Sequence, residues 1–290
     1  MGDKLTAAVA GLYRKVSTEL PADVIEALKN AKNNEDKDSA AFNAIGLILK
    51  NTEAAKNGST AVCQDTGMPT FYVYYPKGSL ITKIKKSIID ATKIATEKGH
   101  LRPNAVNSIT GKNTGNGAGN NIPIINFAEW GNNFLKIELM LKGGGSENVS
   151  CQYSLPDEKI NAGRDLNGVK KCVIDAVQKA QGLGCPPSII GVGIGGDRAN
   201  SYKLAKEQLF RKLNDYNKDE VLAKLEGELC KKLNSLGIGP MGLGGKTTVL
   251  SVKIGAVDRI PASFFVSIAY MCWAARRGSL IIRGNAVKYD

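Results

Sequence analysis

The chain has 290 residues, 43% of them hydrophobic, so it can bury a sizeable core in one or two domains. No apolar run approaches the roughly 18 residues of a membrane span, and the first residues lack the regions of a signal peptide, so we expect no membrane segment and a cytoplasmic location. The net charge of +12 suits an anionic partner, but the basic residues are scattered and aromatic residues make up only 6% of the chain, which argues against nucleic-acid binding.

Periodicity along the chain predicts helices first and mixed structure later. Apolar residues recur at helical spacing up to about residue 57, which indicates two or three helices. Short β-rich runs then alternate with helical ones, with glycine clusters between them. The expected strands are 71–75, 122–127, 135–141, 189–194 and 249–254, and the expected later helices are 79–98, 167–181, 202–213 and 219–236. We therefore expect an α+β (mixed α/β) fold in which N-terminal helices precede mixed sheets flanked by helices, as one domain over residues 1–290.

Six cysteines are spread over a chain that is too long and too lysine-rich for a small disulfide-stapled domain. They form no CxxC pair, so zinc-ribbon and ferredoxin spacings are absent. Reduced thiols or metal ligands fit better. Cys172 and Cys230 each follow apolar residues at helical spacing, and we expect both to be buried or half-buried in the core.

Two glycine-rich segments imitate nucleotide-binding motifs. The first, GVGIGGD at 191–197, cannot be aligned to G-x-G-x-x-G, and a tight strand-to-helix turn explains its glycines better. The second, GPMGLGGKTT at 239–248, has Pro240 where a phosphate loop needs its first glycine. This second segment remains a loop rich in backbone N–H donors, which could contact a carboxylate as easily as a phosphate.

Three further segments carry residues with chemical potential. VCQDTG places Cys63, Gln64 and Asp65 side by side, so that a metal ligand and a proton-transfer group share one turn. GCPP places Cys185 before two prolines, and MCWAARRG places Cys272 just ahead of two arginines. These cysteines are 122 and 87 positions apart, which suits a centre assembled from loops of a folded domain.

Seven motifs together resemble, in this order, those of the class I fumarases and the related tartrate dehydratases. They are VCQDTG, LRPN, TGKNTG, LKGGGSEN, GCPP, LGIGPMGLGGKTT and MCWAARRG, which span nearly the whole chain. By this resemblance Cys63, Cys185 and Cys272 correspond to the three ligands of a [4Fe–4S] cluster held by loops. The fourth iron would be open to substrate, as a Lewis acid rather than a redox centre.

The resemblance also implies an activity, further site residues and a partner chain. The expected activity is that of a hydro-lyase which hydrates fumarate to L-malate reversibly. Asp65 corresponds to the catalytic proton carrier, while Gln64, Arg102 and Gly145 correspond to substrate contacts. Some family members are one long chain and others two, and this sequence resembles the cluster-binding (alpha) subunit. A C-terminal-type (beta) subunit is therefore implied, in a hetero-oligomer built on a dimer.

One position departs from the family, and alternative functions remain. Many relatives have histidine where this chain has Ile260, which puts histidine-assisted proton transfer or substrate orientation in doubt; the one histidine, His100, is expected at the surface. L(+)-tartrate or a mesaconate-type acid is the alternative substrate. The rivals from other classes are a non-catalytic cluster-binding sensor and a basic nucleic-acid binder.

Overall fold

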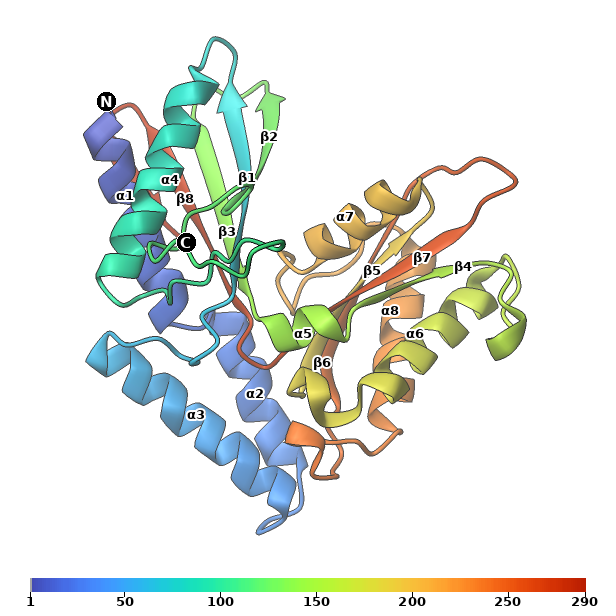
Figure 1. Cartoon of the computed structure of the whole chain (residues 1–290). Helices are drawn as coiled ribbons and strands as arrows, with labels where there is room; N and C mark the ends of the chain where they lie inside the picture. Colours follow the sequence, from blue (N-terminus) through green and yellow to red (C-terminus); the bar gives the residue numbers. More distant parts are fainter. Residues whose placement is uncertain (1) are drawn as a thin grey trace. The chain divides into compact units, whose positions relative to one another are not determined.

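The computed structural model describes residues 2–290, which divide into two units, each with its own sheet and hydrophobic core (Figure 1). The first unit comprises residues 1–21, 50–144 and 274–290, and the second comprises residues 22–49 and 145–273. The division passes through α3 (Ala40–Gly58), so each unit is built from separate stretches of sequence.

The first unit is a five-stranded mixed sheet with two helices packed on it. Its strands are β1 (Met68–Pro76), β2 (Ile124–Trp130), β3 (Leu135–Lys142), β8 (Arg276–Arg283) and β9 (Ala286–Tyr289). Their order is β2-β1-β3-β8-β9, and the pair β1–β2 is parallel while the other pairs are antiparallel. The helices α1 (Gly2–Thr18) and α4 (Ile81–Glu97) pack on each other and on this sheet.

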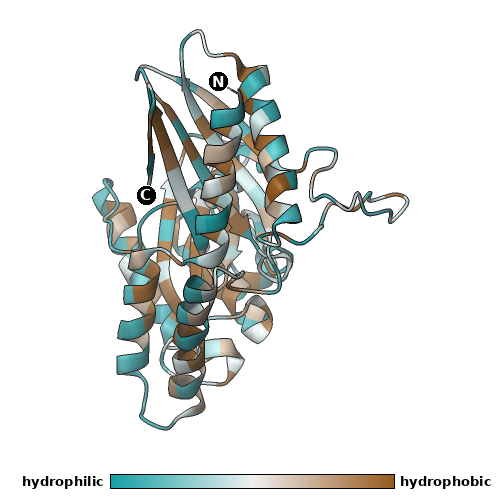
Figure 2. Cartoon of the chain, turned by 90° about the vertical axis from the view of Figure 1, so that its left-hand side faces the viewer, coloured by the Kyte–Doolittle hydropathy of each residue, from teal (hydrophilic) through white to brown (hydrophobic). Residues whose placement is uncertain are grey.

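Helical spacing of apolar residues explains why α1 and α4 bury one face each. On α1, Val9, Leu12 and Val16 are almost fully buried, as expected from the 3.6-residue period. Tyr13 is also fully buried, and its hydroxyl shares a hydrogen bond of 2.8 Å with Thr92 on α4. Figure 2 shows hydrophilic and hydrophobic residues alternating around these helices. Among the helices of residues 2–290, none combines the length and the apolar composition of a membrane span.

The second unit is a four-stranded mixed sheet in the order β4-β7-β5-β6. Its strands are β4 (Cys151–Ser154), β5 (Ser188–Ile194), β6 (Val249–Ala256) and β7 (Phe265–Met271). Its helices are α2 (Ala22–Asn34), α6 (Leu166–Ala180), α7 (Arg198–Gln208) and α8 (Glu220–Asn234), and α5 (Gly144–Asn148) begins at the division. Helix α7 covers one face of the sheet, and α6 and α8 cover the other (Figure 1).

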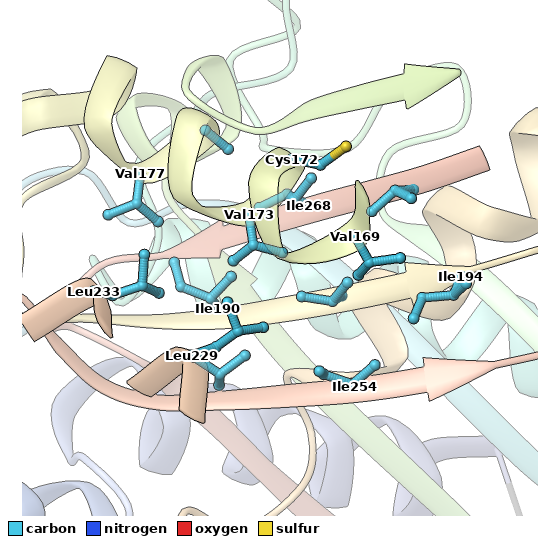
Figure 3. Close-up of a cluster of buried hydrophobic side chains, with 14 of the residues drawn as sticks. Val169, Cys172, Val173, Val177, Ile190, Ile194, Leu229, Leu233, Ile254 and Ile268 are labelled. Carbon is cyan, nitrogen blue, oxygen red and sulfur yellow. The ribbon is translucent and has the colours of Figure 1, made fainter. Parts of the chain in front are cut away.

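The core of the second unit lies between its sheet and the helices α6 and α8. Figure 3 shows Val169, Val173 and Val177 of α6 directed toward apolar residues of the strands. Cys172 is fully buried in this cluster and Cys230 is half-buried against it, so both predictions for these thiols are confirmed.

Most of the predicted elements are present, and four strands and one short helix were not predicted. The helical opening consists of three helices, and every predicted strand overlaps an observed one. The helix predicted at 202–213 begins earlier, at Arg198, where the Asp197 side chain caps it, and ends at Gln208. Apart from three short 3₁₀ turns, the elements of residues 2–290 without a predicted counterpart are α5, β4, β7, β8 and β9. Mixed sheets flanked by helices confirm the α+β fold class.

Candidate active site

The VCQDTG segment forms the turn between α3 and β1 in the first unit. Gly67 has φ +81°, and a Cβ there would lie 2.9 Å from the carbonyl carbon of Lys142 at the end of β3. Only glycine satisfies both the left-handed backbone and this close approach. The turn is thereby fixed against the strand that leads into the GGG run.

Two backbone amides hold the carboxylate of Asp65. Oδ2 accepts a hydrogen bond of 2.7 Å from the amide of Gly144, and Oδ1 accepts one of 3.1 Å from the amide of Gly67. A Cβ at Gly143 would lie 2.8 Å from Oδ2, so a side chain there would displace the carboxylate. Each oxygen keeps a lone pair, so the group is oriented and still able to exchange a proton.

Thr66 ties the LRPN segment to the same turn. This threonine is 2% exposed, and its Oγ1 accepts hydrogen bonds of 3.0 Å from the amide of Arg102 and 3.3 Å from Nδ2 of Asn104. The side chain of Arg102 is exposed and forms no ion pair with any residue of the described chain. A guanidinium with free donors therefore belongs to the same loop system as Asp65.

The other two predicted substrate contacts, Gln64 and Gly145, are both exposed. Gly145 lies in the first turn of α5, and a Cβ there would be 3.7 Å from the carbonyl oxygen of Leu183, an ordinary contact. The fold of the second unit therefore does not itself require glycine at this position. Glycine is required sterically two residues earlier, at Gly143.

Cys185 and Cys272 lie at one edge of the sheet of the second unit. Cys185 ends a short 3₁₀ turn just before β5, with a left-handed φ of 53°, and Cys272 follows the last residue of β7. Since β5 and β7 are antiparallel neighbours, with Ile189 opposite Met271, the two cysteines meet at the same edge. The amide of Trp273 donates to the carbonyl of Cys185 at 3.2 Å and fixes the two loops together.

The third predicted ligand, Cys63, belongs to the first unit. It is half-buried beside Gln64 and Asp65, and none of the six cysteines, all described, forms a disulfide. No group of three or more His, Cys, Asp and Glu residues among residues 2–290 is arranged to hold a metal ion as it stands. Within single units the structure thus brings together Cys185 with Cys272, and Cys63 with Asp65.

Buried polar atoms without partners flank Cys272 on both sides in the sequence. The hydroxyl of Tyr270, two residues before it, makes no hydrogen bond within residues 2–290. Four residues after it, Arg276 is 1% exposed in β8, and its Nε and Nη1 have no hydrogen-bond partner in the described chain. The charge of Arg276 is therefore buried at the start of a strand and not solvated. Arg276 lies in the MCWAARRG motif, but nothing in the sequence indicates that it is buried, and Tyr270 lies in an apolar segment without a motif of its own.

The loop that resembles a phosphate loop is occupied by a carboxylate of the chain itself. Glu35, 6% exposed after α2, accepts hydrogen bonds from the amides of Lys246 at 2.9 Å and Thr247 at 2.8 Å. The side chain of Lys246 pairs with the adjacent Asp36. Of the two anions that the sequence left open for this loop, a carboxylate of the chain accepts from its amides, so these donors have a structural use.

Neither His100 nor Ile260 supplies a charged group at neutral pH. His100 is half-buried, and burial lowers its pKa, with Arg14 and Lys98 adding to the effect, so it is neutral at pH 7. Ile260 is 68% exposed in the loop after β6. It supplies no titratable group at this position.

Comparison with known proteins decides the family. Residues 6–281 match the family model described as fumarate hydratase (Fumerase). The chain belongs to this family. A Geobacillus stearothermophilus protein with the provisional name fumarate hydratase class I is 48% identical over 286 residues, which are 98% of this chain and 56% of that protein. The chain thus spans little more than half of that relative.

Two shorter relatives of the fumarate hydratase family are matched nearly end to end. A Methanocaldococcus jannaschii protein with the provisional name L(+)-tartrate dehydratase subunit alpha is 38% identical over 288 residues, 98% of this chain and 99% of that one. The L(+)-tartrate dehydratase subunit alpha of Escherichia coli K12 is 30% identical over 288 residues, 98% of this chain and 92% of that one. The resemblance inferred from the seven motifs is therefore confirmed.

Proposed function

We propose that this chain is the cluster-binding subunit of a hydro-lyase that interconverts fumarate and L-malate. The observation that carries the proposal is the loop system of the first unit, in which Asp65 is held by two amides and Arg102 is anchored through Thr66. A proton carrier and a carboxylate-binding cation on one rigid loop system are what the hydration of a dicarboxylate needs. Fumarate is favoured as substrate by the 48% identity to the class I relative.

In the proposed reaction, substrate binding and proton transfer fall to different residues. Arg102 binds one carboxylate of the substrate through its planar fork, and Gln64 and the backbone at Gly145 complete the contacts. Asp65 exchanges a proton with the oxygen that leaves as water or enters from it. The amides of Gly67 and Gly144 keep the carboxylate in one orientation throughout.

The proposed cofactor is a [4Fe–4S] cluster held by Cys63, Cys185 and Cys272. Such a cluster supplies Lewis acidity at the iron that has no protein ligand. Two observations support the fit: Cys185 and Cys272 are reduced thiols at one sheet edge, and the buried Tyr270 hydroxyl beside them lacks a partner in the described chain. Thiolates are the ligands that iron–sulfur clusters require, and a reducing location such as the cytoplasm would preserve them.

A beta-type partner chain completes the proposed enzyme. Two relatives that this chain matches over 99% and 92% of their length are named as alpha subunits, and the longer relative extends well beyond the matched region. Three exposed apolar side chains near Cys185, namely Leu183, Met241 and Leu243, offer a surface for another chain. The proposed assembly is a hetero-oligomer built on a dimer, with neither nucleic acid nor membrane as partner.

An anaerobic assay tests the function. The chain is reconstituted with iron and sulfide, the beta-type chain is added, and fumarate absorbance is followed with L-malate or L(+)-tartrate as substrate. Fumarate formed from malate only when both chains and the cluster are present is the expected result. Dehydration of tartrate alone would favour the second candidate, which the names of the two alpha-subunit relatives support.

Other outcomes decide the remaining alternatives. Turnover of a methylated four-carbon acid alone would identify a mesaconate-type enzyme. A loaded cluster with no turnover of any dicarboxylate would overturn the enzyme and favour a cluster-binding sensor. Salt-sensitive retention of DNA by the iron-free chain would favour a nucleic-acid binder.

A further inference from the structure

The hydroxyl of Tyr270 is buried without a hydrogen bond. Tyr270 lies in β7 and is 1% exposed, and its oxygen has no partner in the described residues 2–290. Burying a hydroxyl without a partner is unfavourable, so such groups are rare unless a ligand or a water completes them. Phenylalanine would fill the same space without this cost.

The ring of Tyr270 is packed against the loop that carries Cys185. A Cβ at Gly184 would lie 2.3 Å from Cε1 and 2.7 Å from Cζ of the ring, so glycine is required immediately before Cys185. Tyr270 also lies two residues before Cys272, which follows the last residue of β7. The ring of Tyr270 is therefore next to the loop of Cys185 and on the strand that leads to Cys272.

Ser188 does not satisfy this hydroxyl. Ser188 is the first residue of β5, the strand next to β7, and its side chain is buried. The two hydroxyls nevertheless form no hydrogen bond, and Ser188 Oγ donates to the carbonyl of Thr248 at 3.3 Å. No residue of the described chain 2–290 therefore accepts a hydrogen bond from the O–H of Tyr270.

We propose that Tyr270 is a positioning residue whose hydroxyl donates a hydrogen bond to a sulfur of the iron–sulfur centre that Cys185 and Cys272 help to hold. This inference rests on the cluster of the proposed function. Thiolate or sulfide sulfur is the acceptor that the neighbouring residues supply, and a donor to sulfur stabilises the more negative, reduced form of a cluster. Tyr270 then raises the reduction potential of the centre and slows its loss, without touching substrate.

The test replaces Tyr270 by phenylalanine, which keeps the ring on Gly184 and removes one oxygen. The full chain is reconstituted with iron and sulfide, and the reduction potential is measured by titration followed by electron paramagnetic resonance. We expect Tyr270→Phe to take up a cluster with a more negative potential. Iron release in air should be about 10-fold faster than in the wild type. This is the size of effect expected when a hydrogen-bond partner of a metal ligand is removed.

Two variants in the same unit serve as controls. Tyr153→Phe removes a hydroxyl that donates to Asp175 at 2.6 Å, and Ser188→Ala removes the buried hydroxyl at the start of β5. Both should leave the potential and the rate of iron release unchanged. Identical values for wild type and Tyr270→Phe, or full reproduction of the effect by Ser188→Ala, would overturn the inference while leaving the cluster in place. A wild-type chain that takes up no cluster would overturn the proposed cofactor itself and the inference with it.

Discussion

The carboxylate of Asp65 receives one hydrogen bond on each oxygen, from Gly67 at 3.1 Å and from Gly144 at 2.7 Å. Both donors are backbone amides, which hold the carboxylate in place without taking its proton. Asparagine at this position would keep the shape of the side chain, but its amide nitrogen cannot accept a hydrogen bond from either donor. The same variant cannot carry a proton as a carboxylate does.

Asp65→Asn should therefore lower turnover by at least about 100-fold, the low end of what a positioned acid–base group contributes. Cluster content, measured as iron and sulfide per chain, should stay at the wild-type level because the cysteines are untouched. Asp36→Asn is a matched control on the surface, where the Asp36 side chain pairs with that of Lys246 and with no other side chain of residues 2–290. Unchanged turnover of Asp65→Asn in the complete enzyme would remove Asp65 from the proton-transfer role.

The sequence alone identifies candidate site residues by their reactive side chains. It does not identify the residues that hold those side chains in place. Asp65 and Arg102 stand out because of their side chains and motifs, although their roles stay predictions. Thr66 and Gly143 gain their roles from contacts with residues far along the chain: Thr66 bonds a residue 36 positions later, and the carboxylate next to Gly143 belongs to a residue nearly 80 positions earlier. Local patterns carry no information on such pairings.

The glycines of β5 are required by the close packing of α7 on this strand. A Cβ at Gly191 would lie 2.2 Å from the carbonyl oxygen of Ala205, and one at Gly193 would lie 2.1 Å from that of Ser201, both on α7. The helix backbone therefore rests directly on the strand. The turn that follows uses positive φ at Gly195 and Gly196, as the sequence suggested for a strand-to-helix turn.

Gly193→Ala should destabilise the chain by about 1–3 kcal/mol, because the new methyl group forces α7 away from β5. Gly227→Ala is the matched control, since Gly227 lies within α8 and a Cβ there meets nothing within 4 Å. It should stabilise by about 0.5–1 kcal/mol through helix propensity. Guanidinium denaturation measures both, and a Gly193→Ala chain as stable as Gly227→Ala would refute the close packing.

The elements that the sequence did not predict share a physical cause. β7 and β8 are joined by only four residues, and β8 begins with two arginines, a residue type that is rarely buried. β4 and β9 have four residues each, too few for periodicity to identify them. In α5, three glycines suggested a turn, yet the amide of Gly144 finds an acceptor in Asp65 that stabilises the first turn of a helix.

At the scale of the whole chain, the two units are interleaved in sequence. Their boundaries fall after residues 21, 49, 144 and 273, so the chain passes between the units four times. In the first unit, β3 pairs with β8 through seven residue pairs, from Leu135 opposite Ile282 to Leu141 opposite Arg276. The unit therefore depends on a strand that the chain supplies only after the second unit is complete.

A fragment of residues 1–144 should consequently fail to fold cooperatively. It lacks β8, which leaves one edge of β3 unpaired and removes Leu280 from the core of the first unit. A matched variant joins residue 144 to residue 274 by about four Gly and Ser residues, a length that suits antiparallel neighbours. Because Leu141 and Arg276 are paired directly, this linker can close the sheet. Thermal unfolding followed by circular dichroism should show a cooperative transition for the linked variant only; the same transition in the 1–144 fragment would mean that β3 does not need β8.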